Sequence, residues 1–180
     1  TYPNINETVD DIMIFVTIES IDGVGGVLGS AGPCLYRTGT RFPVVGAMRL
    51  DSADVASLEA SGLLEAVVLH EMAHVIGFGT MWTLPPSLLV DAGQASPYFP
   101  GVNAVTAFKA NCCSGAQNYF NRVPVEGGGG PGTQDSHWRE SAMGAELMTG
   151  YISLTANPLS AITVGSLRDM GYVVSSAFAD

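Results

Sequence analysis

The sequence predicts an α+β fold in a single domain, and three stretches of the chain carry this prediction. The run IMIFVTIE between Asp11 and Ser20 is apolar on both alternating faces and rich in β-branched residues, which is typical of a strand. The stretch LLEAVVLHEMAHVI after Gly62 and the stretch that follows Pro158 both have the apolar spacing of a helix. A chain of 180 residues that is 47% hydrophobic and 13% charged is long enough for one sizeable core.

Two strands are expected before the central helix. The first, from Asp11 to Ser20, is predicted to lie inside the sheet because both of its faces are apolar. Between Ile21 and Thr40 the chain is rich in glycine and has no periodicity, so we expect a long surface loop there. Pro43 then opens a second strand, Val44 to Leu50, and a proline at the first position favours a sheet edge. Such an edge strand can pair with an extended peptide.

The central helix is expected to begin at an N-cap formed by Ser61 or Gly62 and to end at Gly77. From Phe78 to Ser136 the chain is dense in Gly, Pro, Ser and Asn, and it includes four consecutive glycines. Such a long irregular segment inside a compact domain usually serves a functional site.

The last predicted helix starts with a proline in its first turn, at Pro158, and ends at Gly171. Its apolar positions recur with helical spacing and are expected to face the core. These are Leu159, Ile162, Leu167 and Met170.

Composition excludes several classes of partner. The formal net charge is −10 and the seven Lys and Arg residues are scattered, which argues against nucleic acid and anionic membrane surfaces as partners. No apolar stretch approaches the roughly 20 residues that cross a bilayer, so we expect no stable membrane insertion.

The beginning of the chain suits a processed mature protein, and its cysteines are too few for a dense disulfide framework. A start at Thr1 without a basic and apolar leader fits a mature form whose signal or pro-segment has been removed, although a shortened recombinant chain would look the same. Three cysteines allow at most one disulfide and one free thiol. We expect Cys34 to pair with Cys112 or Cys113.

The strongest chemical signal is the segment His70-Glu71-Met72-Ala73-His74, which fits the zinc-binding pattern HExxH. Residues four apart on a helix lie on one face at about 6 Å, so both imidazoles can hold one ion at ~2.1 Å. Glu71 stands about 100° round the helix from His70, where it can touch a water on the metal. Glu71 is therefore the candidate general base.

A catalytic zinc ion needs three protein ligands and one open position. His137 is the one histidine left in the sequence, so it is the candidate third ligand, with a carboxylate as the competing choice. A structural calcium ion among the acidic residues is a weaker alternative, because the spacing of a calcium loop is missing and solvated surface is the better explanation. Those residues are Asp10, Asp11, Asp22, Asp51 and Asp54. A serine hydrolase is disfavoured because no GxSxG occurs.

The sequence also resembles a known family. HEMAHVIG continues HExxH with a glycine, as in the HExxHxxG opening of metzincin proteases, but Thr80 stands where compact metzincins have their third ligand. The later segment SHWRESAMGAELMTG contains His137 and Met148. This pattern resembles leishmanolysin-like peptidases, in which the third histidine follows a long insertion and an ELM segment forms a Met-turn beneath the zinc.

The resemblance implies a metzincin-like zincin domain with a twisted mixed sheet, an active-site helix, a C-terminal helix and a long insertion between the second and third zinc ligands. It also implies that Met148 supports the metal site, and that Gly46 and Ala47 belong to an edge strand that binds the substrate backbone. A pro-segment before maturation is expected from the same resemblance.

The predicted function is a secreted, zinc-dependent endopeptidase that binds one catalytic zinc ion and hydrolyses peptide bonds in extracellular proteins. We expect one catalytic domain over residues 1–180, with an upper part at 1–77, a lower part at 78–180 and the zinc in the cleft between them. The alternative is a catalytically silent zinc-binding adhesin or interaction module. Glu71 separates the two, because a structural zinc site has no use for an unliganded carboxylate beside an open position.

Overall fold

The structure is a computed structural model that describes residues 5–6, 8–111, 121–175, 177 and 179. The chain divides into two compact units, Thr1–Thr80 and Met81–Asp180. That residues 1–77 and 78–180 act as the two parts of one catalytic domain stays a prediction.

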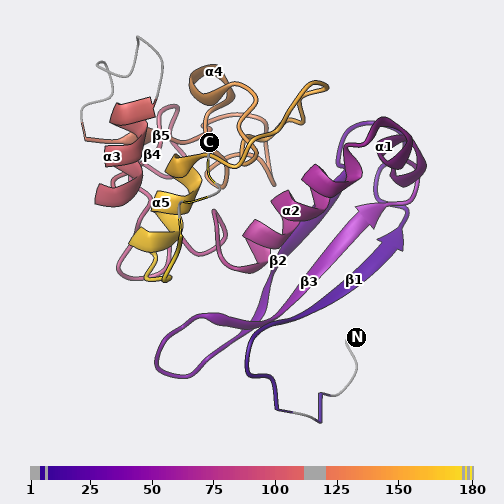
Figure 1. Cartoon of the computed structure of the whole chain (residues 1–180), viewed down its shortest axis with the longest axis horizontal. Helices are drawn as coiled ribbons and strands as arrows, with labels where there is room; N and C mark the ends of the chain where they lie inside the picture. The colour runs from indigo at the N-terminus through magenta and orange to yellow at the C-terminus, as the bar shows by residue number, and fades with distance from the viewer. Residues whose placement is uncertain (1–4, 7, 112–120, 176, 178, 180) are drawn as a thin grey trace. The chain divides into compact units, whose positions relative to one another are not determined.

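The first unit is built on a mixed three-stranded sheet (Figure 1). Its strands are β1 (Met13–Glu19), β2 (Gly29–Tyr36) and β3 (Pro43–Asp51), and their spatial order is β1-β3-β2. β1 runs parallel to β3, whereas β2 runs antiparallel to it. β3 is therefore the middle strand, and it contributes Val45, Met48 and Leu50 to the core.

Two expectations about this sheet are wrong. β1 is an edge strand rather than an interior one, and Val16 and Ile18 in its second half are more than half exposed. β3, expected at the edge because of Pro43, is paired on both sides. A proline at the first residue of a strand lacks its N–H only at the strand end, so the rest of the strand can still form two ladders.

The glycine-rich segment expected to be a loop contains β2, so that expectation is also wrong for Gly29–Tyr36. Glycine weakens a strand, but it is used where another chain segment approaches closely. Here the packing partner is α2 (Leu64–Val75), which lies against β2 and β3 (Figure 1). On β3, a Cβ added at Gly46 would come 2.2 Å from a Val75 methyl carbon, so this glycine permits close contact with α2.

A short helix not expected from the sequence, α1 (Val55–Ser61), precedes α2. Gly62 is the C-cap of α1 in the left-handed region at φ 74°, a conformation that glycine adopts without steric cost. The prediction that Ser61 or Gly62 begins the central helix is thus wrong, because α2 begins at Leu64 after Leu63. The expected end is close to the observed one, since Ile76 is the C-cap of α2.

The described residues of the second unit form two short strands and three helices. The strands β4 (Tyr98–Phe99) and β5 (Val123–Pro124) pair antiparallel. The helices are α3 (Val102–Asn111), α4 (Glu140–Met143) and α5 (Ala161–Asp169). The segment expected to be irregular therefore includes α3, which lies against α5.

The final helix, α5, was predicted correctly but begins later than expected. Its N-cap is Ser160, whose side chain accepts a hydrogen bond from the Thr163 N–H. Ile162 and Val164 are buried, whereas the other three residues expected to face the core are only partly so. At its C-terminal end, the Asp169 carboxylate accepts bonds from the backbone N–H groups of Asn103 and Ala104. Asp169 thereby caps the first turn of α3.

Large aromatic side chains form the core of the second unit. Trp82, Phe99 and Trp138 are each 0% exposed, and the two Trp rings lie 5.0 Å apart between centroids. Trp138 donates its indole N–H to Thr163 Oγ1 at 2.8 Å, which satisfies its one polar group inside the core. This packing fixes the backbone immediately after His137.

The expected α+β class is confirmed, with helices, one mixed sheet and one small antiparallel sheet in the same chain. Within the described residues, every helix is too short or too polar to cross a lipid bilayer. The metzincin arrangement and the expected insertion remain predictions.

Candidate metal centre

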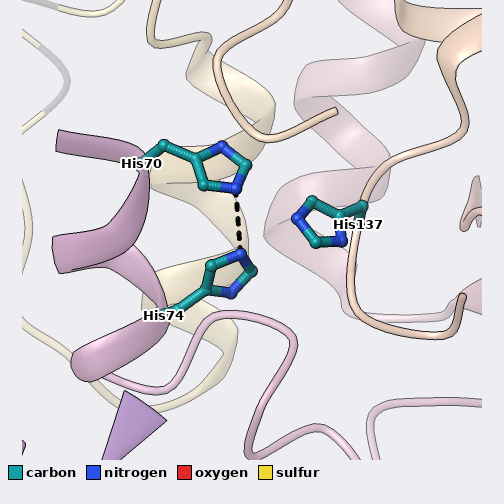
Figure 2. A group of neighbouring side chains, drawn as sticks. All are labelled: His70, His74 and His137. Atoms are coloured by element: carbon teal, nitrogen blue, oxygen red, sulfur yellow. Dashed lines mark hydrogen bonds between the residues drawn. The ribbon is translucent and has the colours of Figure 1, made fainter. Parts of the chain in front are cut away.

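The first two candidate ligands, His70 and His74, lie one turn apart on α2 (Figure 2). Their Nε2 atoms are 3.0 Å apart, and the two rings meet edge to face with their centroids 4.7 Å apart. Zinc binds imidazole nitrogen at about 2.0–2.1 Å, so a single ion can reach both Nε2 atoms across this separation. A hydrogen bond at this distance needs a proton on only one Nε2, and a shared cation could take the place of that proton.

His74 is held in the orientation that metal binding requires. Its Nδ1 lies 2.9 Å from the carbonyl oxygen of Phe78. A carbonyl only accepts hydrogen bonds, so Nδ1 carries the proton in this pair and Nε2 keeps its lone pair. The ring is 6% exposed, and an anchored second nitrogen is the usual companion of a histidine metal ligand.

Glu71 follows His70 on α2 and is almost fully buried, at 5% exposure. Its Oε2 is buried and has no hydrogen-bond partner among the described residues. Burial without a compensating partner disfavours the charged form, and it raises the pKa of Glu71 to about 7. A carboxylate of this kind is costly for stability, which makes Glu71 a candidate functional residue.

His137 belongs to the second unit, where it directly precedes the buried Trp138. It is 6% exposed, and its Nδ1 lies 3.1 Å from the Thr133 carbonyl oxygen and 3.0 Å from Ser136 Oγ. The carbonyl again places the proton on Nδ1 and leaves Nε2 as the acceptor. His137 therefore has the same tautomer as His74, with the proton on Nδ1.

Met148 is fully buried in the same unit, at 0% exposure. Its carbonyl oxygen accepts from the Trp138 N–H at 3.0 Å, so it is tied to the residue that follows His137. Its own N–H donates to the carboxylate of Glu146. This arrangement connects the Met148 turn directly with the His137 segment.

Glu146 is a structural residue that the sequence did not single out. Its buried carboxylate also accepts from the Ser160 N–H, the Ser160 hydroxyl and the Thr163 hydroxyl. Burial raises the pKa of Glu146, while these donors act in the opposite direction. A glutamate two positions before the methionine was visible in the sequence, but only the fold supplies its partners from α5.

The predicted substrate-binding role of Gly46 and Ala47 conflicts with the sheet topology. Gly46 pairs with Ile14 and Pro33, and Ala47 pairs with Phe15 and Gly32. A strand that already has a neighbour on each side cannot add an extended peptide. These two residues therefore do not form a substrate-binding edge.

The predicted solvated surface for the acidic residues is wrong at two positions. Asp51 and Asp54 are 0% and 5% exposed. Four backbone N–H groups donate to the Asp51 carboxylate, and the Gly25 N–H donates to Asp54. These carboxylates organise the loop between β1 and β2, and calcium at this loop stays a prediction.

The predicted disulfide cannot be followed in the structure. Cys34 lies on β2 with an exposed side chain. Cys112 and Cys113 lie outside the described residues. A pairing of Cys34 with either of them remains a prediction.

Comparison with known proteins gives a match over nearly the whole chain. The family described as leishmanolysin, Peptidase M8, matches residues 4–179. The chain belongs to the leishmanolysin family. The family match therefore includes both histidines of α2, Glu71, His137 and Met148, although it does not by itself assign their roles.

Curated family members match at moderate identity. A leishmanolysin homolog from Crithidia fasciculata is 27% identical over 90% of this chain, and the match covers 24% of that protein. Leishmanolysin from Leishmania donovani is 27% identical and that from Leishmania chagasi is 29% identical, each over 90% of this chain. Those matches cover 27% and 26% of the relatives, so the chain spans about a quarter of their length.

The residues of this family member offer a suitable donor set for a metal ion. His70, His74 and His137 each provide one ring nitrogen, and all three could hold a metal. Neutral imidazole nitrogen is a preferred zinc donor, and both buried rings already have Nδ1 anchored. The chemistry of these donors therefore fits zinc.

Proposed function

We propose that this chain is the catalytic part of a zinc-dependent endopeptidase that hydrolyses peptide bonds in proteins. The single observation that carries the proposal is Glu71, a buried and unpartnered carboxylate next to a histidine pair whose Nε2 atoms are 3.0 Å apart. Membership of the leishmanolysin family supports the same reaction. A purely structural zinc site would gain nothing from this carboxylate and would bear its desolvation cost.

In the proposed reaction, the residues of α2 have separate tasks. His70 and His74 hold the zinc ion, which when bound supplies Lewis acidity and lowers the pKa of a coordinated water to about 7. Glu71 accepts the proton of the attacking water and then delivers it to the leaving amine. The buried position of Glu71 keeps bulk water from competing for that proton.

We assign the third ligand to His137 and the hydrophobic support of the site to Met148. The hydrogen bond at Nδ1 of His137 leaves the lone pair on Nε2, the nitrogen that would bind zinc, and the ring is as buried as that of His74. Met148 is tied through its carbonyl to Trp138, so the ligand segment and the Met-turn would move together. With three histidines bound, one position of a tetrahedral zinc ion stays open for water and substrate.

The proposed substrates are extracellular proteins and peptides, and the proposed location of the enzyme is outside the cell. This location follows the sequence-based expectation of a secreted endopeptidase. The test is expression of the chain with its native upstream sequence in the source cell, followed by detection in washed cells and in the medium. Protein retained inside the cell would contradict secretion without affecting the catalytic proposal.

Substitution Glu71→Gln tests the proposed reaction. Because the amide cannot take up the proton, we expect kcat for casein or a quenched fluorescent peptide to fall by about 10²- to 10⁴-fold. The zinc content, measured by mass spectrometry of the metal, should remain that of the wild type because His70 and His74 are unchanged.

The matched control is Glu65→Gln, which makes the same chemical change at an exposed position of α2. We expect its kcat to equal that of the wild type. Full activity in Glu71→Gln would remove Glu71 from the mechanism. Zinc binding by a wild-type chain that hydrolyses none of these substrates would favour the silent binding module instead.

A further inference from the structure

The backbone of β2 runs directly beside the carboxylate of Glu71. If Gly29 carried a Cβ, that atom would lie 2.9 Å from Glu71 Oε1 and 3.1 Å from Glu71 Cγ. It would also lie 3.1 Å from the Arg49 carbonyl oxygen on the neighbouring strand. Distances below 3.0 Å are too short for a carbon in van der Waals contact, so the carboxylate occupies space that any side chain at Gly29 would take.

The backbone conformation gives no separate reason for glycine at position 29. Gly29 is the first residue of β2, and its φ lies outside the left-handed region that other residues avoid. Gly62, by contrast, has a positive φ of 74° and open space around its missing side chain. The constraint at Gly29 is therefore steric and comes from its neighbours, above all from Glu71.

Among the described residues, no hydrogen bond holds the Glu71 carboxylate in its position beside Gly29. Glu71 Oε2 has no hydrogen-bond partner among the described residues. The carboxylate is the free end of a side chain with three rotatable bonds, so a methyl group at position 29 can push it aside at modest cost to the fold. The Arg49 carbonyl at 3.1 Å has to give by only a few tenths of an ångström, so the larger displacement falls on the flexible Glu71 side chain.

We infer that Gly29 is a positioning residue for Glu71: its missing side chain leaves the space in which the catalytic carboxylate is held. This inference rests on the proposed role of Glu71 as general base. Gly29 sets the carboxylate position through contact alone and does not bind zinc. The strand β2 thus has a direct part in shaping the catalytic site.

The test is the variant Gly29→Ala. We expect kcat for a fluorescent peptide to fall by about 100-fold, the loss that follows when a reacting group is misplaced by about 1 Å. KM, the zinc content and the thermal unfolding midpoint should stay close to wild type, because the zinc ligands and the sheet are unchanged. A crystal structure of the variant should show the Glu71 carboxylate displaced from the position it has in the wild-type crystal structure.

The matched control is Gly128→Ala, in the second unit. There the added Cβ would lie 3.6 Å from Glu126 Oε1, an ordinary van der Waals distance to a glutamate oxygen. We expect this variant to keep the wild-type kcat.

A second variant separates positioning from general damage to the strand. In the Glu71→Ala background the Cγ and the carboxylate are absent, so adding Gly29→Ala should reduce the residual kcat much less than it reduces that of the wild type. Equal reductions in both backgrounds, or an undisplaced carboxylate in Gly29→Ala, would overturn the role of Gly29. An inactive wild-type chain with bound zinc would instead overturn the proposed function, and the role of Gly29 with it.

Discussion

At the scale of single residues, three buried carboxylates in this chain serve different purposes. Asp51 is surrounded by backbone N–H donors, and Glu146 accepts from backbone and hydroxyl groups. Glu71 has a buried oxygen without any partner among the described residues. The first two arrangements stabilise local structure, whereas the third costs free energy, as the proposed general base would.

The ionisation of Asp51 should make the free energy of unfolding depend on pH. Backbone N–H groups, that of Ala53 foremost, hold the pKa of Asp51 below its usual range. Because the folded pKa is below the unfolded one, the contribution to stability is present above the unfolded pKa and is lost as the pH falls through the folded pKa. Asp51→Asn should therefore reduce the free energy of unfolding at pH 7, with a smaller reduction near pH 3.

Urea unfolding of the two proteins at both pH values measures this difference. Asp10→Asn is the control, because Asp10 is exposed and its Oδ1 accepts only the neighbouring Asp11 N–H. If the free energy of unfolding of the wild type exceeded that of Asp51→Asn by the same amount at pH 7 and at pH 3, the stabilising role of the ionised Asp51 carboxylate would be contradicted.

At the scale of elements, the order of the strands decides which residues can meet a substrate. The apolar character of β1 and the proline of β3 both indicated the wrong positions in the sheet. Strand order depends on which backbones pair, and a strand's own composition constrains this only weakly. With β3 in the middle, the outer edges belong to β1 and β2.

An extended substrate should therefore add to β2 rather than to β3. α2 lies against β2, and Gly29 of β2 lies beside Glu71, so a peptide on this edge would pass the proposed base. Backbone methylation of a peptide inhibitor at alternate amides should raise its inhibition constant about tenfold for each ladder bond lost. Methylation of the intervening amides is the control, because those groups point away from the strand.

A crystal structure with the unmethylated inhibitor would locate the pairing. Backbone hydrogen bonds from the inhibitor to Gly29–Tyr36 are the expected result. Pairing with β1, or an inhibitor bound without any strand pairing, would rule out this role for β2.

At the scale of the whole molecule, the proposed zinc site draws on both compact units. His70 and His74 belong to the unit Thr1–Thr80, and His137 belongs to the unit Met81–Asp180. Loss of a residue that only hydrogen-bonds a metal ligand weakens metal binding by up to about 100-fold. His137→Ala removes a proposed ligand itself, so it should weaken zinc binding by more than that. Competition with a calibrated chelator measures the dissociation constant.

Ser136→Ala is the matched control for this prediction. It removes one neighbour of His137 Nδ1 but leaves the Thr133 carbonyl as partner, so we expect a dissociation constant within about tenfold of wild type. Circular dichroism should show both variants folded. Unchanged zinc affinity in a folded His137→Ala chain would assign the third ligand to another residue.

From the sequence alone came the α+β class, the helix that carries His70, Glu71 and His74, and the final helix near Pro158. These depend on local spacing, because side chains four apart on a helix meet whatever the rest of the chain does. The HExxH pair could thus be identified without the fold.

Only the tertiary structure decided the strand order, the burial of Asp51 and Glu146, and the contact of Gly29 with Glu71. Each of these depends on residues distant in the sequence, and no periodicity within one segment reveals them. Gly29 is the clearest example, because in the sequence it is one glycine among many in a predicted loop. In the fold it leaves room for the carboxylate that the sequence had already indicated as the base.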